Sequence, residues 1–247
     1  MDTFERLHFV STSQLMRILN CPRRTANYIT KTHLIEPRFV RRISTPRGED
    51  DVLTLTRFKE KSYFTLAHDL EVSWQMIFSS EPPAGVKVIA LSRDPERIEI
   101  RTSKRPYTPD YFLGLEGENL DEHGRKKTCF YFCEVTKARP GTHGTRDLIE
   151  KCERYNDFFE TGQFPDWLKK RFGYEKRDFR VLFSFPTTER ALNFVADLAQ
   201  RDFPKKGKFF AASESGIRGG KDFVGFYDRT WYSPKDHPTL HTLLEHI

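Results

Sequence analysis

Two aromatic segments separated by a polar one constrain the fold of this chain most strongly. Residues 109–115 (PDYFLGL) and 128–136 (TCFYFCEVT) are rich in aromatic and β-branched side chains, whereas residues 116–127 are rich in Gly, Asp, Asn and Lys. Short aromatic runs bounded by turn residues are typical of β-strands. The pattern therefore predicts an antiparallel hairpin with a polar tip.

This hairpin would place two carboxylates beside each other. Asp110 opens the first strand and Glu134 lies near the end of the second, so antiparallel pairing would bring them to the same edge. Mg²⁺ prefers carboxylate, water and phosphate oxygens as ligands. We therefore expect Asp110 and Glu134 to hold Mg²⁺ or Mn²⁺, which activates water for phosphodiester hydrolysis. The competing interpretation is that Asp110 begins a turn and Glu134 is an ordinary strand carboxylate.

The same stretch resembles the PD-(D/E)XK nuclease superfamily, in which a Pro-Asp pair, a hairpin and a Glu-X-Lys motif follow one another. A nearer likeness is the replication-relaxation family. Its members join a winged helix to a domain with a Pro-Asp strand, a strand similar to residues 130–136 and a following helix containing Lys and Tyr. Pro109-Asp110, then Lys151 and Tyr155, match that order here. The resemblance implies a metal-dependent DNA endonuclease.

The chain departs from the superfamily where its lysine is expected. Thr136 stands two residues after Glu134, and Lys137 would point to the opposite face of the strand, because side chains alternate along it. Further on, helical spacing is seen in Leu148, Cys152, Tyr155 and Phe159. Lys151 borders this stripe. We expect Lys151 to replace the missing lysine, because related folds carry it on the neighbouring helix.

A helix is predicted over residues 59–79, where apolar side chains recur every three or four positions. In the superfamily the first core helix often donates an acidic residue to the site. The resemblance therefore makes Glu71 a candidate third catalytic carboxylate, with a solvent-exposed helix Glu as the competing interpretation. His68, on the same side of the helix, is expected to be a hydrogen-bonded residue at the edge of the core.

The first sixty residues predict a helix-turn-helix followed by a β-hairpin. Ser11 or Thr12 would cap a first helix, and Asn20-Cys21-Pro22 would turn the chain into a second helix ending near residue 33. Residues 39–43 and 52–55 would form a wing. The second helix of such a motif enters the major groove of DNA, and a wing contacts phosphates or the minor groove. The candidate DNA-binding residues are Arg23, Arg24, Asn27, Lys31, Arg41, Arg42 and Arg47.

The basic excess of the chain is concentrated in this module. The formal net charge of the chain is +6, and residues 1–61 contain 12 Lys or Arg and 7 Asp or Glu, which gives +5. A localised positive charge attracts a polyanion. We therefore expect DNA as the partner, and the alternatives are a winged module that binds protein or a basic face that is simply solvated.

Cysteine usage and hydropathy predict a reduced, cytoplasmic protein that does not enter a membrane. The four cysteines, at positions 21, 129, 133 and 152, form no CxxC pair and no spacing typical of a disulfide framework. They are expected to be core thiols rather than zinc ligands. No apolar run approaches the roughly 18 residues of a membrane helix, and the first residues do not begin a signal peptide.

The whole pattern predicts an α/β (α+β) chain of two domains. A winged helix-turn-helix would occupy residues 1–58, and a restriction-endonuclease-like mixed sheet flanked by helices would occupy residues 59–247. Further strands are expected at 86–91, 97–101, 179–185, 209–212 and 223–227, with helices at 188–200 and after Asp236.

Three functions are consistent with these residues. The first is an endonuclease whose winged helix holds DNA while the second domain cuts it. Cutting both strands would need two such domains, which suggests a homodimer. The second is a non-catalytic DNA-binding protein for plasmid or phage replication, mobilisation or regulation, which Thr136 in the lysine position favours. A purely protein-binding adaptor is the third alternative, and the +5 front module makes it the weakest.

Overall fold

The chain forms two compact units, Met1–Ile77 and Phe78–Ile247. A computed structural model describes residues 7–35, 40–43, 51–55, 63–102, 106–136, 145–218 and 225–247. The division falls inside helix α4 (Tyr63–Ser79), so most of this helix groups with the first unit. The predicted domain boundary between residues 58 and 59, like the predicted start of the helix at residue 59, lies outside the described residues.

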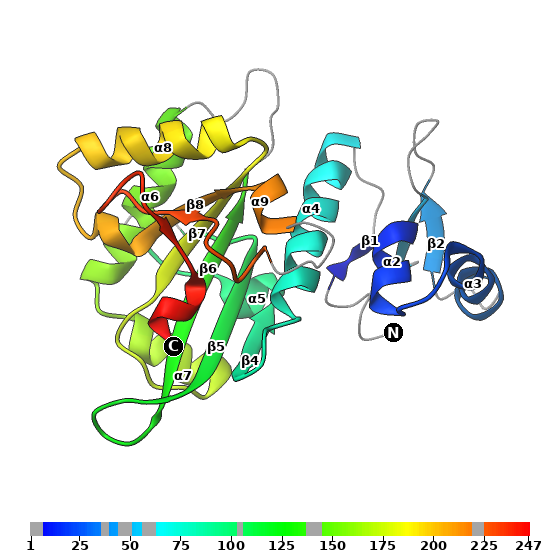
Figure 1. Cartoon of the computed structure of the whole chain (residues 1–247), viewed down its shortest axis with the longest axis horizontal. Helices are drawn as coiled ribbons and strands as arrows, with labels where there is room; N and C mark the ends of the chain where they lie inside the picture. The colour runs from blue at the N-terminus through cyan, green and yellow to red at the C-terminus, as the bar shows by residue number, and fades with distance from the viewer. Residues whose placement is uncertain are drawn as a thin grey trace. The chain divides into compact units, whose positions relative to one another are not determined.

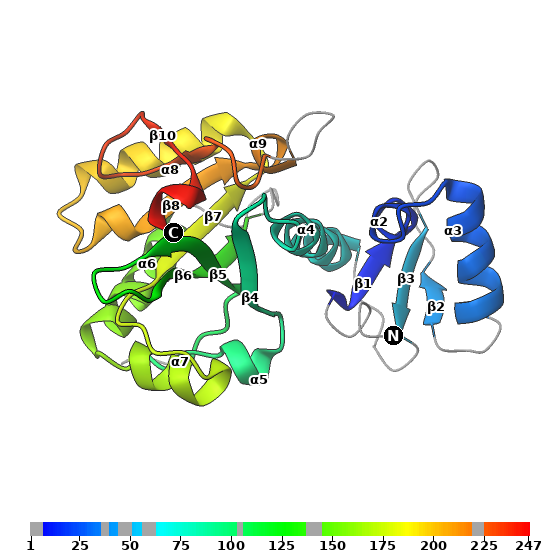
Figure 2. The same cartoon turned by 60° about the horizontal axis from the view of Figure 1, so that its bottom comes forward.

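The first unit contains a small antiparallel sheet. Figure 2 shows strand β3 lying between β1 and β2, in agreement with the order β1-β3-β2. The elements are β1 (Phe9–Ser11), α2 (Thr12–Ile18), α3 (Arg23–Ile29), the π-helical turn η1 (Thr30–Ile35), β2 (Val40–Ile43) and β3 (Val52–Leu55). The predicted hairpin pairs Val40 with Leu55 and Ile43 with Val52. Of its predicted tip, residues 44–51, all but Asp51 lie outside the described part of the chain.

The start of α2 is fixed by a capping box. Ser11 Oγ accepts a hydrogen bond from Gln14 N at 3.2 Å, and Gln14 Oε1 accepts one from Ser11 N at 2.7 Å. Two donors at the helix start are thereby satisfied. The amide of Gln14 also donates to Leu70 O on α4 at 2.8 Å. The same polar side chain therefore starts one helix and holds it to another.

The second unit is built on a seven-stranded mixed sheet in the order β10-β9-β8-β7-β6-β5-β4. β4, β5 and β6 form an antiparallel meander, β6, β7 and β8 are parallel, and β9 and β10 return antiparallel. The strands are β4 (Val86–Ser92), β5 (Tyr111–Leu120), β6 (Lys126–Val135), β7 (Arg180–Phe185), β8 (Phe209–Ser213), β9 (Trp231–Tyr232) and β10 (Leu240–His241). The predicted mixed sheet flanked by helices is confirmed (Figure 1).

Helices α6 (Thr145–Glu160), α7 (Phe164–Phe172) and α8 (Thr188–Gln200) supply the crossovers that parallel strands require. Their apolar side chains join one core cluster with Phe132, Val181 and Phe183 of the sheet. Phe132 is its centre and contacts the rings of Tyr155, Phe158, Phe164, Trp167 and Phe179. The three helices therefore cover the sheet face on which Phe132 lies.

The opposite face is covered by residues 225–247. Tyr131, which alternates with Phe132, donates its hydroxyl to Leu243 O at 3.3 Å, and Thr242 Oγ1 donates to Tyr227 O. Figure 1 shows the C-terminal turn η3 (Leu243–His246) in front of β5 and β6. Asn119 of β5 binds Ile247 O at 3.1 Å. Residues 225–247 thus close the second layer without forming a long helix.

The strand predicted at residues 97–101 is wrong. Residues 95–98 form the helical turn α5 (Pro95–Ile98), because Asp94 caps it through its side chain to Glu96 N at 2.9 Å and Pro95 suits the first helical position. Ile100 then makes only an isolated antiparallel bridge with Tyr107. This bridge positions a residue of the candidate site.

The helix predicted after Asp236 and the strand at 223–227 are also wrong. Residues 225–227 form a turn, and residues 223–224 lie outside the described ranges. After Asp236 the chain forms β10 and the 3₁₀ turn η3, which is capped by Thr242 and Glu245. The side chain of Asp236, which the prediction makes a helix cap, binds His241 Nε2 at 2.9 Å.

His241 lies between two carboxylates. Its Nδ1 is 3.0 Å from Glu245 Oε2, and Nε2 faces Asp236. Burial alone would lower the pKa of His241, but the hydrogen bonds and charges of Glu245 and Asp236 outweigh burial and raise that pKa above 6.5. The folded chain therefore holds this proton more tightly than the unfolded chain does.

We predict a pH-dependent contribution of His241 to stability. Because its pKa is raised in the folded state, the contribution is complete below the unfolded pKa of 6.5 and is lost as pH rises through the folded value. The difference in the free energy of unfolding between the wild type and His241→Gln, from urea denaturation, is expected to shrink from about pH 6 to about pH 9. A difference that does not change with pH would contradict the two ion pairs.

Among the described residues, no helix is long and apolar enough to cross a membrane.

Candidate active site

The structure brings Asp110 and Glu134 to the same end of the β5–β6 hairpin. Tyr111 pairs with Cys133, so Asp110, directly before β5, lies opposite Glu134. Asp110 N donates to Cys133 O at 3.1 Å, and Asp110 Oδ2 accepts a hydrogen bond from Val135 N at 2.7 Å. Asp110 therefore extends the ladder by one residue, with one carboxylate oxygen bound to the neighbouring strand.

Glu134 is a buried carboxylate bound by its own chain. Its side chain is 1% exposed. Oε1 accepts hydrogen bonds from Tyr107 Oη at 2.7 Å and Tyr155 Oη at 2.5 Å, and Oε2 accepts one from Lys151 Nζ at 2.6 Å. A charge removed from water needs such partners, because the desolvation cost is otherwise several kcal/mol. Glu134 is therefore the meeting point of β6, α6 and the segment before β5.

The position of Lys151 follows from the pattern of α6. Leu148, Cys152 and Tyr155 are buried in the core, as the helical spacing predicts. Lys151 stands beside this stripe, so its long side chain runs along the edge of the core and its ammonium group reaches Glu134. It remains 22% exposed. The structure thus places the amine of Lys151 beside Glu134, although the strand position at which the resemblance implies a lysine is occupied by Thr136.

The charges of both carboxylates affect the pKa of Lys151. Burial alone would lower the pKa of Lys151, but the charges of Glu134 and Asp110 and the hydrogen bond to Glu134 outweigh it and raise that pKa above 10.5. Burial and the charge of Glu134 raise the pKa of Tyr107 and that of Tyr155 well above 10. The two phenols are therefore neutral donors at neutral pH, and Lys151 is a cation.

Two residues of this cluster had no signal in the sequence. Tyr107 lies outside the strands and is held by two backbone hydrogen bonds of 2.8 Å with Ile100. Arg154 lies over its ring, 5.1 Å from the centroid, and binds Glu150 at 2.5 Å. A tyrosine in a non-periodic segment gives no pattern to read. Only its position three residues before Asp110 could have drawn attention to it.

Thr136 has a structural contact where the superfamily would carry its lysine. Its side chain is 6% exposed, and Oγ1 and N both donate to Ser184 O, at 2.7 and 2.9 Å. Thr136 thereby continues the pairing of β6 with β7 beyond the end of β6. Lys137 lies outside the described residues.

Glu71 lies in the first unit, on α4, and its place in the site stays a prediction. It is 2% exposed and accepts a hydrogen bond from Gln75 Nε2 at 3.5 Å. The competing interpretation of a solvent-exposed glutamate is therefore wrong. His68 is half-buried on the same helix.

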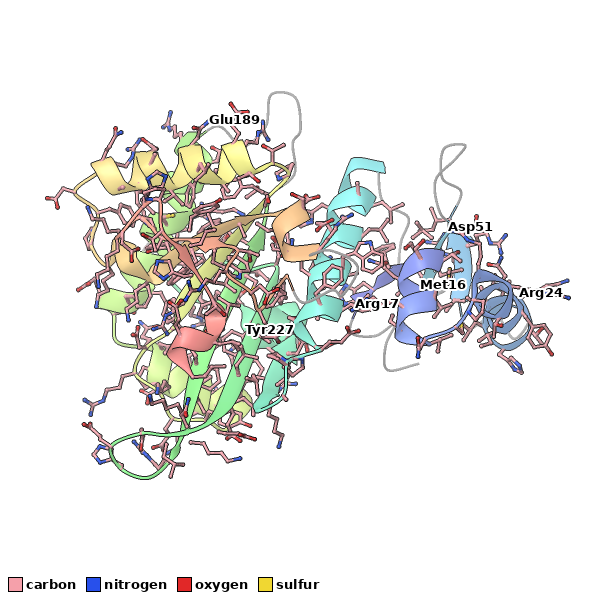
Figure 3. All side chains as sticks on the ribbon, viewed as in Figure 1. Met16, Arg17, Arg24, Asp51, Glu189 and Tyr227 are labelled. Carbon is pink, nitrogen blue, oxygen red and sulfur yellow. The ribbon has the colours of Figure 1, made fainter. Side chains whose placement is uncertain are left out.

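The candidate DNA-binding residues of the first unit lie mainly on the surface of α3 and η1. The exposed ones are Arg23, Arg24, Asn27 and Lys31. Arg24 projects from α3 in Figure 3. Tyr28, on the same helix, is 62% exposed. On β2, Arg42 is exposed and lies 3.4 Å from Asp51 Oδ2, while Arg41 is partly buried. Arg47 lies outside the described residues.

The two carboxylates offer oxygen ligands of the type that Mg²⁺ and Mn²⁺ prefer. Within the described ranges, no group of three or more His, Cys, Asp or Glu side chains could hold a metal ion. The ammonium group of Lys151, which feels both negative charges, occupies the place of a cation beside Glu134. The carboxylate oxygens are therefore of the chemical type that suits a divalent ion, and Lys151 lies against one of them.

We predict that the ion pair of Lys151 is essential for stability. Lys151→Met would leave Glu134 buried without its counter-charge, which costs about 3–5 kcal/mol in buried pairs. The double variant Lys151→Met/Glu134→Gln should recover part of this loss in urea denaturation. Lys169→Met is the matched control, since Lys169 lies at the same distance of 2.6 Å from Glu175 but both side chains are exposed. Equal losses for Lys151→Met and the control would contradict the prediction.

Comparison with family models, with curated proteins and with solved structures gives no match.

Proposed function

We propose that the second unit is a metal-dependent DNA endonuclease and that the first unit holds the DNA. The observation that carries the proposal is the contact of Lys151 Nζ with Glu134 Oε2 at 2.6 Å, with Asp110 opposite Glu134 on the neighbouring strand. Two carboxylates and an amine are the groups that the PD-(D/E)XK resemblance requires. Here the helix after the hairpin supplies the amine.

The architecture of the second unit supports the same proposal. An antiparallel meander is followed by a crossover helix and a parallel strand, and helices flank the mixed sheet. This arrangement is in keeping with a restriction-endonuclease-like core. The two carboxylates stand at the end of the sheet where β6 leads into the segment before α6.

Each residue of the cluster would have a separate role. Asp110 and Glu134 would hold Mg²⁺ or Mn²⁺, which supplies charge stabilisation and an activated water for phosphodiester hydrolysis. Tyr107 and Tyr155 would orient Glu134 through its Oε1. Lys151, once released from Glu134, would bind an oxygen of the scissile phosphate and stabilise its developing charge.

The first unit would act as a winged helix-turn-helix. α2 and α3 are consecutive helices, and β2 and β3 pair as the proposed wing. Arg23, Arg24 and Asn27 are exposed on α3, the helix that would enter the major groove. The concentration of basic charge in residues 1–61 supports electrostatic binding to phosphates.

A second candidate function is favoured by the burial of Glu134. Both of its oxygens are bound by side chains of the same chain, and it is 1% exposed. Such a cluster can serve as a buried structural network. The second unit would then be a non-catalytic nuclease-like domain in a DNA-binding protein for replication, mobilisation or regulation.

We predict that DNA cleavage with Mg²⁺ or Mn²⁺ depends on the cluster. Asp110→Ala, Glu134→Ala and Lys151→Met should each lower the cleavage rate about 100-fold or more, as is typical when one group that stabilises transition-state charge is removed. Supercoiled, linear, branched and single-stranded DNA are the substrates. Lys169→Met is the control and should cut at the wild-type rate. Cleavage that survives both carboxylate substitutions would refute the assignment.

Calorimetric titration with Mn²⁺ separates the two candidates without measuring cleavage. If the ion displaces Lys151, the variant Lys151→Met should bind Mn²⁺ more tightly than the wild type, because a competing cation has been removed. If neither form binds Mn²⁺ and salt-sensitive DNA binding persists, the non-catalytic function is supported.

We predict that DNA binding depends on α3. Reversal of charge in Arg23→Glu/Arg24→Glu should weaken binding and lower the slope of log affinity against log salt by about 2, because each phosphate contact contributes about 0.9. Fluorescence anisotropy at several salt concentrations measures both quantities. Lys170→Glu/Arg177→Glu, which reverses two exposed charges in the second unit, is the matched control. Equal effects of the two double variants would place the DNA contact elsewhere.

A further inference from the structure

A cavity of about 470 Å³ opens near the amino ends of β7 and β8. Its walls come from the start of β7, the turn before β8 and the segment from Ser233 to Glu245. Four of the lining side chains are basic: Arg180, Lys205, Lys208 and Lys235. The volume lies in the range of small-molecule sites, roughly 300–1,000 Å³.

This cavity is separate from the Glu134 cluster. In the parallel register of β6 and β7, Glu134 pairs with Phe183 and Tyr131 pairs with Arg180. Side chains alternate along a strand, so positions 180 and 183 lie on opposite faces of the sheet. Glu134 shares the face of α6, whereas Arg180 shares the face covered by the C-terminal residues. A ligand of this cavity therefore does not touch the candidate active site.

The acidic residues of the cavity are partly compensated by one histidine. Asp236 and Glu245 both bind the ring of His241, at 2.9 and 3.0 Å. Because these contacts raise the pKa of His241 against the effect of burial, its positive charge is favoured between the two carboxylates. One net negative charge therefore remains on these walls, against four basic side chains.

The basic side chains themselves are only partly neutralised. Lys208 pairs with Asp178, and Lys205 lies 3.8 Å from Glu160. Arg180 donates to Cys129 Sγ at 2.7 Å, which is not a carboxylate. Lys235 is exposed and forms no ion pair with the residues that the structure describes. A positive field therefore remains available to an anion.

The turn before β8 contributes Lys205, Gly207 and Lys208 to the wall of the cavity. Lys205 adopts a left-handed backbone with φ of 53°, and its carbonyl accepts Lys208 N at 2.8 Å. Such a conformation is unfavourable for a residue other than glycine. A Cβ at Gly207 would lie 3.2 Å from Lys235 Cδ, so the glycine lets the stem of Lys235 approach the turn. The turn therefore brings three lysines to one cavity.

We propose that this cavity binds the phosphate group of a nucleotide or of a nucleic-acid backbone. Lys235, Lys205 and Arg180 would hold the phosphate oxygens, since charge-assisted hydrogen bonds to phosphate are the natural use of clustered basic groups. Phe210, which packs edge-on against His241 at 5.9 Å, gives the cavity an apolar wall. The site does not depend on metal binding at Glu134.

The test uses the full chain and three probes in calorimetric titrations. Adenosine 5′-monophosphate presents a phosphomonoester, a dT₁₂ oligonucleotide without terminal phosphates presents phosphodiesters, and adenosine presents no phosphate. Lys235→Gln removes the unpaired charge, and Lys87→Gln, which changes an exposed lysine on β4, is matched in net charge. The oligonucleotide is titrated in the background Arg23→Glu/Arg24→Glu, so that binding by α3 does not hide the result.

The expected result is that Lys235→Gln lowers the affinity for at least one phosphate-bearing probe about tenfold, which is the effect of losing about one charged contact. Lys87→Gln is expected to leave both affinities unchanged. Weakening of the monophosphate identifies a nucleotide site, and weakening of the oligonucleotide alone identifies a backbone site. Lys205→Gln should act in the same direction. The proposal is overturned if neither probe binds, if adenosine binds as well as its phosphate, or if Lys235→Gln and Lys87→Gln are equivalent.

Discussion

The compensation of one buried carboxylate organises the candidate site. Glu134 lies at the end of a central strand, where burial would make its charge costly without partners. Lys151 supplies the counter-charge from α6, and two phenols supply the remaining hydrogen bonds. Because these donors come from separate segments, the strand, the helix and the segment before β5 are fixed relative to one another by a single side chain.

The same network gives the two candidate functions a common physical basis. A catalytic role requires that a divalent ion compete with the ammonium group of Lys151 and that Glu134 keep its orientation when the lysine leaves. A structural role requires only that the network stay closed. The phenols matter in both cases, since burial and the nearby charge of Glu134 raise their pKa values and keep them protonated. The two functions therefore differ in whether a divalent ion can replace the ammonium group of Lys151 beside Glu134.

Much of this arrangement could be predicted from periodicity. Alternation and aromatic content gave the β5–β6 hairpin, and helical spacing placed Lys151 at the border of a buried stripe. Tyr107 could not be predicted, because an isolated bridge leaves no repeating pattern. The segments at 97–101 and after Asp236 were misassigned because local capping by Asp94 and Thr242 outweighed the apolar spacing. The burial of Glu71 depends on tertiary packing, which a helical pattern alone does not determine.

The bridge between Ile100 and Tyr107 also affects the solvent exposure of Glu134, because Tyr107 binds its carboxylate. Ile100 is fully buried and is joined to Tyr107 by two backbone hydrogen bonds, while the side chain of Tyr107 is held by Glu134, Tyr155 and Arg154. Each such bond contributes about 1 kcal/mol net. Withdrawal of Tyr107 would break these side-chain contacts together with the two backbone hydrogen bonds, and Glu134 would still be bound by Tyr155 and Lys151. The pairing of Ile100 with Tyr107 therefore couples access to the carboxylate to the packing around it.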